Sequence, residues 1–197
     1  MEKVVFLDRD GTINEEVNYL HRTEDLKFLP GVPEALRLLK EAGFKLVVVT
    51  NQAGVARGYY TCADVEHLHA YMNEELKKYG AEIDAFYYCP HHPVHGIGIY
   101  KKVCQCRKPG TGMFLQAEER FRIDKAHSYM IGDKLLDVEA GVHYGVPGIL
   151  VGTGYGADIN REIKEKGEKP LYDFYAETLM DAARYIRARE GKTASSV

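Results

Sequence analysis

The stretch Val4-Val5-Phe6-Leu7-Asp8-Arg9-Asp10-Gly11-Thr12 decides how the chain folds. Its first four residues form a short apolar run with β-branched and aromatic side chains, which predicts a buried strand. Gly11 permits the sharp turn that ends this strand, so Asp8 and Asp10 lie at its carboxyl end. Ligands of open α/β sheets bind at that edge. The stretch therefore predicts an α/β fold that carries two acidic side chains into a ligand site.

Alternating strands and helices are predicted after this stretch. We expect further strands at 45–50, 85–88, 128–131 and 148–151. We expect helices at 31–43, 63–79, 112–122, 135–144 and 177–189. This order predicts a doubly wound parallel sheet, Rossmann-like, with helices on both faces. Only one helix is expected between the first two strands, so no separate cap domain is predicted. The segment 155–174 is charged and irregular, and no element is assigned to it.

The composition is typical of a soluble globular domain. The chain has 197 residues, of which 45% are hydrophobic and 28% charged, and we expect one domain over 1–191 with a disordered polar tail over 192–197. No apolar stretch reaches the roughly 20 residues that cross a membrane. Without the pattern of a signal peptide, a cytoplasmic protein is predicted. The net charge of −3 argues against a nucleic-acid surface, and a monomer is the default expectation because no heptad pattern is present.

Polar side chains follow or adjoin three further predicted segments. They are Thr50-Asn51-Gln52, Arg107-Lys108 and Gly132-Asp133-Lys134 with Asp137. One aspartate or Thr-Asn pair after a strand is more typical of a turn or a helix cap. Four such groups in one doubly wound order are much harder to explain as turns. Their joint occurrence favours a functional site.

Phosphoryl transfer is the chemistry that needs this set of residues. A carboxylate such as Asp8 can attack phosphorus and form an aspartyl-phosphate. Because a phosphate dianion repels a carboxylate, a hard cation such as Mg²⁺ must bridge them, and Asp8 and Asp133 can supply oxygen ligands. Thr50 and Lys108 can hold the phosphoryl oxygens. Asp10 can protonate the leaving oxygen and then take a proton from the attacking water.

These residues resemble the phosphatase branch of the haloacid dehalogenase-like superfamily. The likeness covers about residues 4–152, and its four signatures are Asp8 to Thr12, Thr50, Lys108 and Gly132-Asp133 with Asp137. It implies that Asp8 is the nucleophile and Asp10 the general acid and base. It also implies that Mg²⁺ is bound by Asp8, Asp133 and the backbone carbonyl of Asp10. Asp10 argues against a dehalogenase, since that reaction needs no second acid there.

Cys89-Pro-His91 and Cys104-Gln-Cys106 form a second motif, with twelve residues between the two pairs. In a reducing cytosol, clustered cysteines near histidines favour a metal over disulfides. Three thiolates and one imidazole make a tetrahedral set for structural Zn²⁺. The alternative is that the cysteines are small buried residues and His91 belongs to a polar turn.

Zinc would give structure to a glycine-containing loop at about 89–106. His92 or His95 could replace His91 as the ligand. Arg107 and Lys108 follow the loop directly, so the metal would position a phosphate-binding lysine. The remaining cysteine, Cys62, is expected to be an ordinary free thiol.

Longer strings narrow the resemblance to capless, zinc-loop members of the superfamily. They are Asp8 to Asn14, Val49 to Gly58, Tyr88 to Pro93, Cys106 to Pro109 and Met130 to Lys134. The one group of such members that these strings resemble removes the C7 phosphate of D-glycero-D-manno-heptose 1,7-bisphosphate during the synthesis of nucleotide-activated heptose. The resemblance implies substrate contacts at Arg9, Glu16, Val17, Asn18, Tyr19, Asn51, Gln52, Ala53, Arg107 and Lys134.

A bisphosphate needs a second cationic contact, and the planar fork of Arg107 suits it, with Arg57 as a possible helper. Three other functions stay open. A histidinol-phosphate phosphatase resembles this branch in fold, catalytic residues and zinc loop. A polynucleotide 3′-phosphatase shares the first two signatures, but the acidic chain lacks a basic surface along which a strand would lie. An inactive, zinc-stabilised phosphosugar-binding module is the non-enzyme alternative, and the intact pair of aspartates argues against it.

Overall fold

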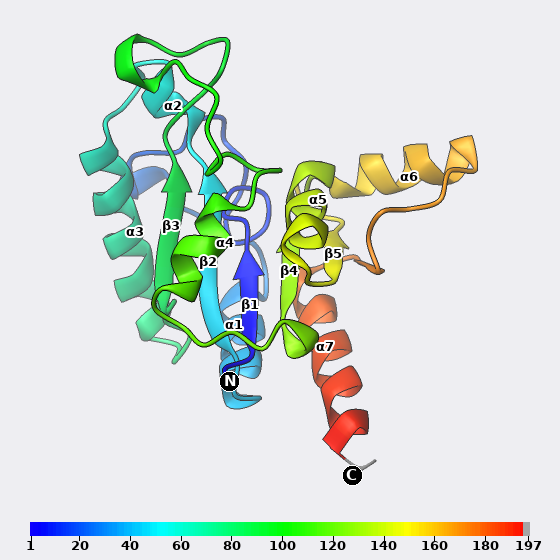
Figure 1. Cartoon of the computed structure of the whole chain (residues 1–197). Helices are drawn as coiled ribbons and strands as arrows, with labels where there is room; N and C mark the ends of the chain where they lie inside the picture. Colours follow the sequence, from blue (N-terminus) through cyan, green and yellow to red (C-terminus); the bar gives the residue numbers. More distant parts are fainter. Residues whose placement is uncertain (195–197) are drawn as a thin grey trace.

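The computed structural model describes residues 1–194 and contains one sheet of six parallel strands (Figure 1). The strands are β1 (Val4–Leu7), β2 (Lys45–Asn51), β3 (Ala85–Cys89), β4 (Tyr129–Gly132), β5 (Gly148–Val151) and β6 (Phe174–Ala176). Their order in the sheet is β3-β2-β1-β4-β5-β6. This is the predicted doubly wound α/β fold. The strand that carries the acidic motif lies between β2 and β4, in the middle of the sheet.

Helices cover both faces of the sheet. They are α1 (Val32–Glu41), α2 (Ala53–Ala56), α3 (Cys62–Lys77), α4 (Gly112–Glu118), α5 (Leu135–Tyr144), α6 (Gly156–Lys166) and α7 (Leu179–Ala194). Short 3-10 turns lie at Thr23–Asp25, Gly98–Tyr100 and Lys125–His127. No helix in residues 1–194 has the length and apolar character needed to cross a bilayer. Between β1 and β2 the chain forms one 3-10 turn and α1, so the expectation of a fold without a cap is confirmed.

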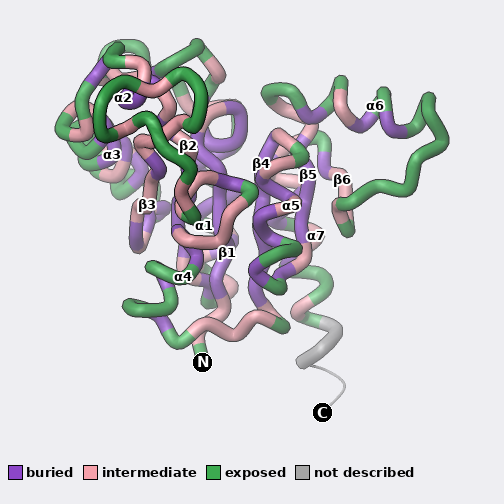
Figure 2. The backbone as a smooth tube through the Cα atoms, turned by 45° about the horizontal axis from the view of Figure 1, so that its top comes forward, coloured by how far each residue is buried: buried purple, intermediate pink, exposed green. Residues whose placement is uncertain are grey.

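The core is divided by the sheet because successive side chains of a strand point to opposite faces. Val5 and Leu7 of β1 pack in one cluster with residues of α1, α7 and the end of α3. Val4 and Phe6 pack in the other with residues of α4 and α5. All four side chains are fully buried, and the strands form the buried centre of the molecule in Figure 2. β1 is therefore held rigidly from both faces.

The register brings the carboxyl ends of three strands together. Leu7 pairs with Val48 of β2 and with Ile131 of β4, all in parallel orientation. Just beyond the strand, the amide of Asp8 donates to the carbonyl oxygen of Ile131 at 2.9 Å. The polar residues that follow these strands thus meet at one edge of the sheet, as expected.

Several predicted boundaries differ from the structure. α4 ends at Glu118 rather than 122, because the amides of both Arg120 and Phe121 donate to the carbonyl of Ala117 and the chain tightens into a turn. The segment described as irregular contains α6, which ends at Gly167 in the left-handed conformation. It also leads into β6. The last helix continues to Ala194, three residues into the predicted tail, and residues 195–197 lie outside the described part.

Candidate active site

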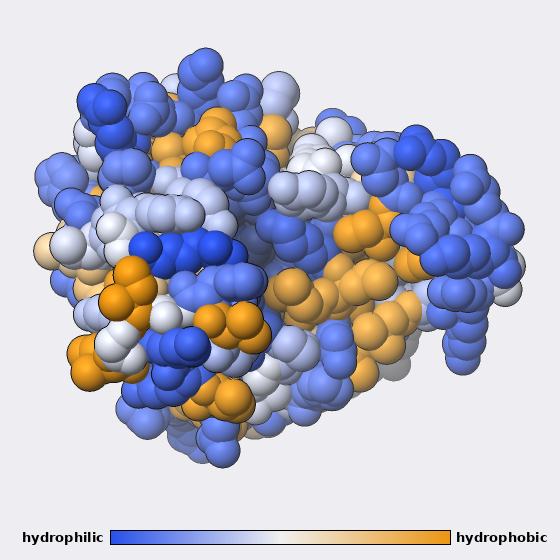
Figure 3. Space-filling view, turned by 90° about the horizontal axis from the view of Figure 1, so that it is seen from above, coloured by the Kyte–Doolittle hydropathy of each residue, from blue (hydrophilic) through white to orange (hydrophobic). Residues whose placement is uncertain are grey.

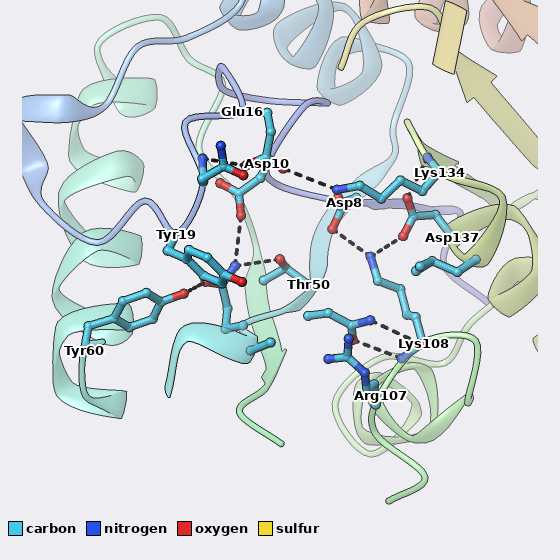
Figure 4. Close-up of a pocket in the computed structure, with 15 residues that line it drawn as sticks. Asp8, Asp10, Glu16, Tyr19, Thr50, Tyr60, Arg107, Lys108, Lys134 and Asp137 are labelled. Atoms are coloured by element: carbon cyan, nitrogen blue, oxygen red, sulfur yellow. Dashed lines mark hydrogen bonds and ion pairs between the residues drawn. The ribbon is translucent and has the colours of Figure 1, made fainter. Parts of the chain in front are cut away.

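A pocket of about 260 Å³ lies beyond the carboxyl ends of β1 and β2 (Figure 4). Figure 3 looks down onto this edge, where hydrophilic residues surround a hollow. The lining residues are Asp8, Asp10, Glu16, Asn18, Tyr19, Thr50, Asn51, Gln52, Ala53, Tyr60, Arg107, Lys108, Lys134, Leu136 and Asp137. Most of the residues predicted for the site are thus brought together. Arg9, Val17 and Asp133 are not among the lining residues: Arg9 and Asp133 are fully buried, and Val17 is exposed.

Lys108 lies at the centre of the pocket's charges. Its Nζ is 2.7 Å from Oδ1 of Asp8 and 2.7 Å from Oδ1 of Asp137 (Figure 4). Burial disfavours the ammonium, but the carboxylates of Asp137 and Asp8 outweigh it and raise the pKa of Lys108. Lys108 therefore stays charged. The role of Asp137 as its partner was not predicted, although the motif that contains Asp137 was.

The backbone of Lys108 is fixed by a residue from the neighbouring strand. Asn51, the last residue of β2, accepts a hydrogen bond from the Lys108 amide at 3.0 Å and donates to its carbonyl at 3.2 Å. A side-chain amide that pairs with both backbone groups of one residue replaces the hydrogen bonds that a neighbouring strand would make. Asn51 thus positions Lys108 and also lines the pocket.

Three carboxylates gather where the magnesium site was predicted. One oxygen from each of Asp8, Asp133 and Asp137 lies within 4.8 Å of the others, and all three residues are buried. Burial and the charge of Asp8 raise the pKa of Asp133 to about 7. Burial and the charge of Asp8 likewise raise the pKa of Asp137 to about 6, with Lys108 opposing. Such a cluster is costly without a cation, and hard oxygen ligands fit Mg²⁺.

Asp133 has the features of a ligand held ready for a cation. Its Oδ2 accepts a hydrogen bond from the amide of Tyr155 at 3.1 Å. Its Oδ1 is buried and has no hydrogen-bond partner among the described residues. Gly11 and Gly154, both at positive φ, approach so closely that a Cβ on either would collide with the Asp133 carboxylate. Two glycines therefore make room for a carboxylate whose Oδ1 has no hydrogen bond and only the ammonium of Lys134 at 3.9 Å, and the residues fit a bound Mg²⁺.

Asp10 is held by a dense set of donors. Oδ1 accepts from Arg9 Nε at 3.1 Å, from Arg9 Nη2 at 3.0 Å and from Asn14 at 3.0 Å. Oδ2 accepts from Arg9 Nη2 at 2.9 Å and from Gln52 at 3.0 Å. Burial opposes the charged form, but Arg9 and these hydrogen bonds lower the pKa of Asp10 overall. The carboxylate is thus fixed in place and ionised in the free protein.

Gln52 links Asp10 to other lining residues. Its Nε2 also donates to Oγ1 of Thr50 at 2.9 Å, and its Oε1 accepts from the hydroxyl of Tyr60 at 2.7 Å. Sequence reasoning missed Tyr60 and Asn14 because neither follows a strand. Among the sequence signals, only the string Asp8 to Asn14, quoted for the family resemblance, includes one of these two residues.

At the mouth of the pocket, residues that are distant in the sequence contact each other. Nζ of Lys134 lies 3.3 Å from Oε2 of Glu16 and over the ring of Tyr155. Asn18 and Tyr19 have φ of 52° and 65°, a conformation that a bulky residue such as Tyr19 rarely adopts. Because such strain clusters at functional sites, this turn fits the predicted substrate contacts.

The predicted zinc ligands form a compact cluster. The Sγ atoms of Cys89, Cys104 and Cys106 lie 3.1–3.5 Å apart, and Nδ1 of His91 lies 3.4 Å from Cys106 and 3.7 Å from Cys89. A disulfide would need about 2.05 Å. Metal–ligand lengths of about 2.0–2.3 Å place tetrahedral ligands roughly 3.4–3.8 Å apart. The two His91 distances lie in this range and two of the three sulfur–sulfur distances are up to a few tenths of an ångström shorter, so the cluster is close to the size of a Zn²⁺ site.

Of the histidines considered, His91 is the one in the cluster. The Nδ1 of His92 accepts instead from the backbone amides of Val94 and His95. Arg107 connects the cluster to the pocket, since its Nη1 donates to the carbonyl of His91 at 3.2 Å. The loop that the metal would hold therefore leads directly to Arg107 and Lys108.

Comparisons with known proteins identify the family. A model described as HAD-hydrolase-like matches residues 105–182, and one described as polynucleotide kinase 3 phosphatase matches residues 3–139. The chain is 44% identical to the D-glycero-β-D-manno-heptose-1,7-bisphosphate 7-phosphatase of Haemophilus ducreyi, over 94% of this chain and 98% of that protein. The chain belongs to the haloacid dehalogenase-like phosphatase family.

Other members of the family agree with this assignment. The phosphatase of the same name from Escherichia coli K12 is 48% identical over 76% of this chain and 79% of that protein. The solved D,D-heptose 1,7-bisphosphate phosphatase of B. bronchiseptica, complexed with magnesium and phosphate, has a TM-score of 0.80 and 32% identity, covering 95% and 99% of the two chains. That of Burkholderia thailandensis has a TM-score of 0.65 and 30% identity, covering 93% and 97%. The expected family is confirmed.

Proposed function

We propose that this phosphatase removes the C7 phosphate of D-glycero-β-D-manno-heptose 1,7-bisphosphate, in the synthesis of nucleotide-activated heptose. The observation that carries the proposal is the buried group formed by Asp8, Asp133 and Lys108, in which two candidate metal ligands and a cation meet at the carboxyl edge of the sheet. Relatives that share nearly their full length with this chain carry that substrate in their names, which supports the choice of the ester and of the β anomer.

The reaction would proceed in two steps. An oxygen of Asp8 attacks phosphorus, the bond to the C7 oxygen breaks, and that oxygen receives a proton from Asp10. Because Asp10 is ionised in the free protein, it must first take up this proton, from solvent or from the bound phosphate, when the substrate binds. Asp10, now a carboxylate, takes a proton from water as the water oxygen attacks phosphorus. The bond between phosphorus and Asp8 then breaks, and inorganic phosphate leaves. Thr50 and Lys108 hold the phosphoryl oxygens in both steps.

Asp8, Asp133 and the backbone carbonyl of Asp10 would hold Mg²⁺. When bound, the ion neutralises the repulsion between the phosphate and the carboxylates. Asp137 contributes indirectly, since it keeps Lys108 charged and in place. Zn²⁺ on Cys89, His91, Cys104 and Cys106 would have a structural role, because four protein ligands leave no open position.

Arg107 and Lys134 are the best contacts for the second phosphate. Both line the pocket, on opposite sides of Asp8 in Figure 4. The planar guanidinium of Arg107 can bind phosphate with two parallel hydrogen bonds. When the substrate binds, the ammonium of Lys134 would leave its ion pair with Glu16 and contact the phosphate instead. The remaining lining residues Asn18, Tyr19, Gln52 and Ala53 are proposed to contact the sugar. For Arg9 and Val17, which do not line the pocket, the predicted contact remains an expectation from the family resemblance.

A histidinol-phosphate phosphatase is the second candidate, and the pair of cations favours a bisphosphate over a substrate that carries an amine. The test compares kcat/KM for both anomers of heptose 1,7-bisphosphate, histidinol phosphate and a simple monophosphate, each with Mg²⁺. We expect the β bisphosphate to be preferred by at least tenfold. A preference for histidinol phosphate would favour the second candidate. Absence of phosphate release from every ester would favour the binding module.

We further propose that the phosphatase is a cytoplasmic monomer with no nucleic-acid or membrane partner. The net charge of −3 and the small-molecule size of the pocket support this. Light scattering at micromolar concentration should give a mass near 22.3 kDa. A concentration-independent dimer mass would contradict it.

A further inference from the structure

A fully buried arginine lies directly behind Asp10. The Arg9 side chain has no exposed surface, although guanidinium groups are seldom buried without several partners. Two of its nitrogens, Nε and Nη2, donate to Asp10, and Nη2 also donates to the carbonyl of Leu20 at 3.1 Å and to Oε1 of Gln52 at 3.2 Å. These contacts fix one side of the guanidinium and leave Nη1 to be satisfied separately.

His69 is the partner of Nη1. Its Nε2 lies 3.3 Å from Nη1 of Arg9, and both side chains are buried. Arginine only donates, so the Nε2 atom of His69 must be the acceptor and must carry no proton. Burial and the charge of Arg9 lower the pKa of His69 to about 3, which agrees with a neutral ring.

The orientation of the His69 ring is fixed by its surroundings. His69 belongs to α3, and its ring stacks on Phe86 of β3 with centroids 4.6 Å apart and planes 20° apart. A ring locked between a helix and a strand offers Nε2 in one direction only. The three residues thus form a chain of contacts from α3, through Arg9, to the carboxylate of Asp10.

We propose that His69 and Arg9 are positioning residues that hold the Asp10 carboxylate where it exchanges a proton with the leaving oxygen. The inference rests on the proposed function, because it assigns the proton transfer to Asp10. Arg9 has two requirements at once: it must present two donors to Asp10, and Nη1 of its fully buried side chain must still have an acceptor. Without His69 the guanidinium would turn toward another acceptor, and Asp10 would turn with it.

The test uses His69→Phe, which keeps an aromatic ring against Phe86 but removes the acceptor. His69→Gln is the rescue variant, because its amide oxygen reaches about as far as Nε2. His67→Phe, at an exposed position of the same helix, is the matched control. Each variant is assayed with an alkyl ester, heptose bisphosphate, and with p-nitrophenyl phosphate, whose leaving group needs no protonation.

We expect His69→Phe to lower kcat for the alkyl ester by about tenfold, a part of what a general acid contributes. KM should stay unchanged, and kcat for p-nitrophenyl phosphate should fall by less than about twofold. His69→Gln should restore most of the loss, and His67→Phe should match the wild type. An equal fall for both esters, or no fall, would overturn the proposal, since a general disturbance of the fold does not depend on the leaving group.

This experiment tests the placement of Asp10 independently of the substrate proposed above. If the wild type prefers another alkyl phosphate, the ratio between that ester and p-nitrophenyl phosphate still measures the placement of Asp10. Nitrogen NMR of the wild type gives a second measurement that needs no variant. It should show His69 with Nε2 unprotonated between about pH 5 and 8. A protonated Nε2 would rule out the contact with Arg9.

Discussion

The ammonium of Lys108 lies 2.7 Å from Oδ1 of Asp8, and both side chains are less than a tenth exposed. Asp137 holds the same ammonium from its other side. The carboxylate that we propose as the nucleophile is thus kept beside a cation that has a second carboxylate partner. Because Lys108 has two carboxylate partners, the loss of Asp8 would still leave it paired with Asp137.

Asp8→Asn should abolish phosphate release while the protein stays folded. An amide cannot form the acyl-phosphate, whereas Asp137 still pairs with Lys108 and prevents an unpaired buried charge. Phosphate release and thermal unfolding should be measured on the same preparation. If more than a few per cent of the activity remains, Asp8 is not the nucleophile.

Gly154→Ala should weaken the response to Mg²⁺. A Cβ at residue 154 would collide with the carboxylate of Asp133, and φ of 55° adds strain. We expect the Mg²⁺ concentration for half-maximal activity to rise by about tenfold or more, the equivalent of about 1.4 kcal/mol. Gly167→Ala is the control, because its φ is 65° but no atom lies within 4 Å of the new Cβ. Equal Mg²⁺ dependence in the two variants would contradict the role given to Asp133.

Removal of zinc should raise KM more than it lowers kcat. The loop loses its tether, and Arg107 loses the fixed carbonyl of His91 to which it donates. Strong chelation or Cys106→Ser should have this effect, with metal content measured alongside. Cys62→Ser is the control, since Cys62 lies outside the cluster. Unchanged kinetics in protein shown to be free of zinc would refute the positioning role.

Acid should destabilise the protein partly through His69. The pKa of His69 is about 3 in the folded protein, against an ordinary value of 6.5. Between these values the unfolded chain binds a proton that the folded protein does not, so the free energy of unfolding falls by up to about 1.4 kcal/mol per pH unit as pH decreases. Denaturant unfolding of wild type and His69→Gln between pH 7 and 5 should show the shallower decline in the variant. Parallel declines would mean that His69 is not buried in neutral form.

Much of the fold was predictable because strong local patterns coincide with its elements. The strand Val4–Leu7 and the helix Leu135–Tyr144 were predicted with the bounds found. α6 was missed because Ile163 is its one buried aliphatic side chain, although Gly167 marked its end. Periodicity cannot detect a helix that buries so little.

The site was predicted where its residues lie at the carboxyl end of a strand or directly after it. Thr50 lies at the end of β2, and Asp8 and Asp133 directly follow β1 and β4. The buried contacts of Arg9 were not predictable, since its partner His69 comes from the middle of a helix 60 residues away. Within α3, His69 is spaced like the other buried core residues of the helix, so nothing in the sequence distinguishes it from them. The pairing of Lys134 with Glu16 likewise depends on two turns that only the folded chain brings together.

The central place of β1 has a consequence for how the protein is made. β1 leaves the ribosome well before its neighbour β4, which is encoded more than 120 residues later. One edge of the strand that precedes Asp8 stays without its partner until those residues have been synthesised. Unpaired apolar edges invite association with other chains. Truncated or slowly translated chains should therefore aggregate through the very strand that leads into Asp8.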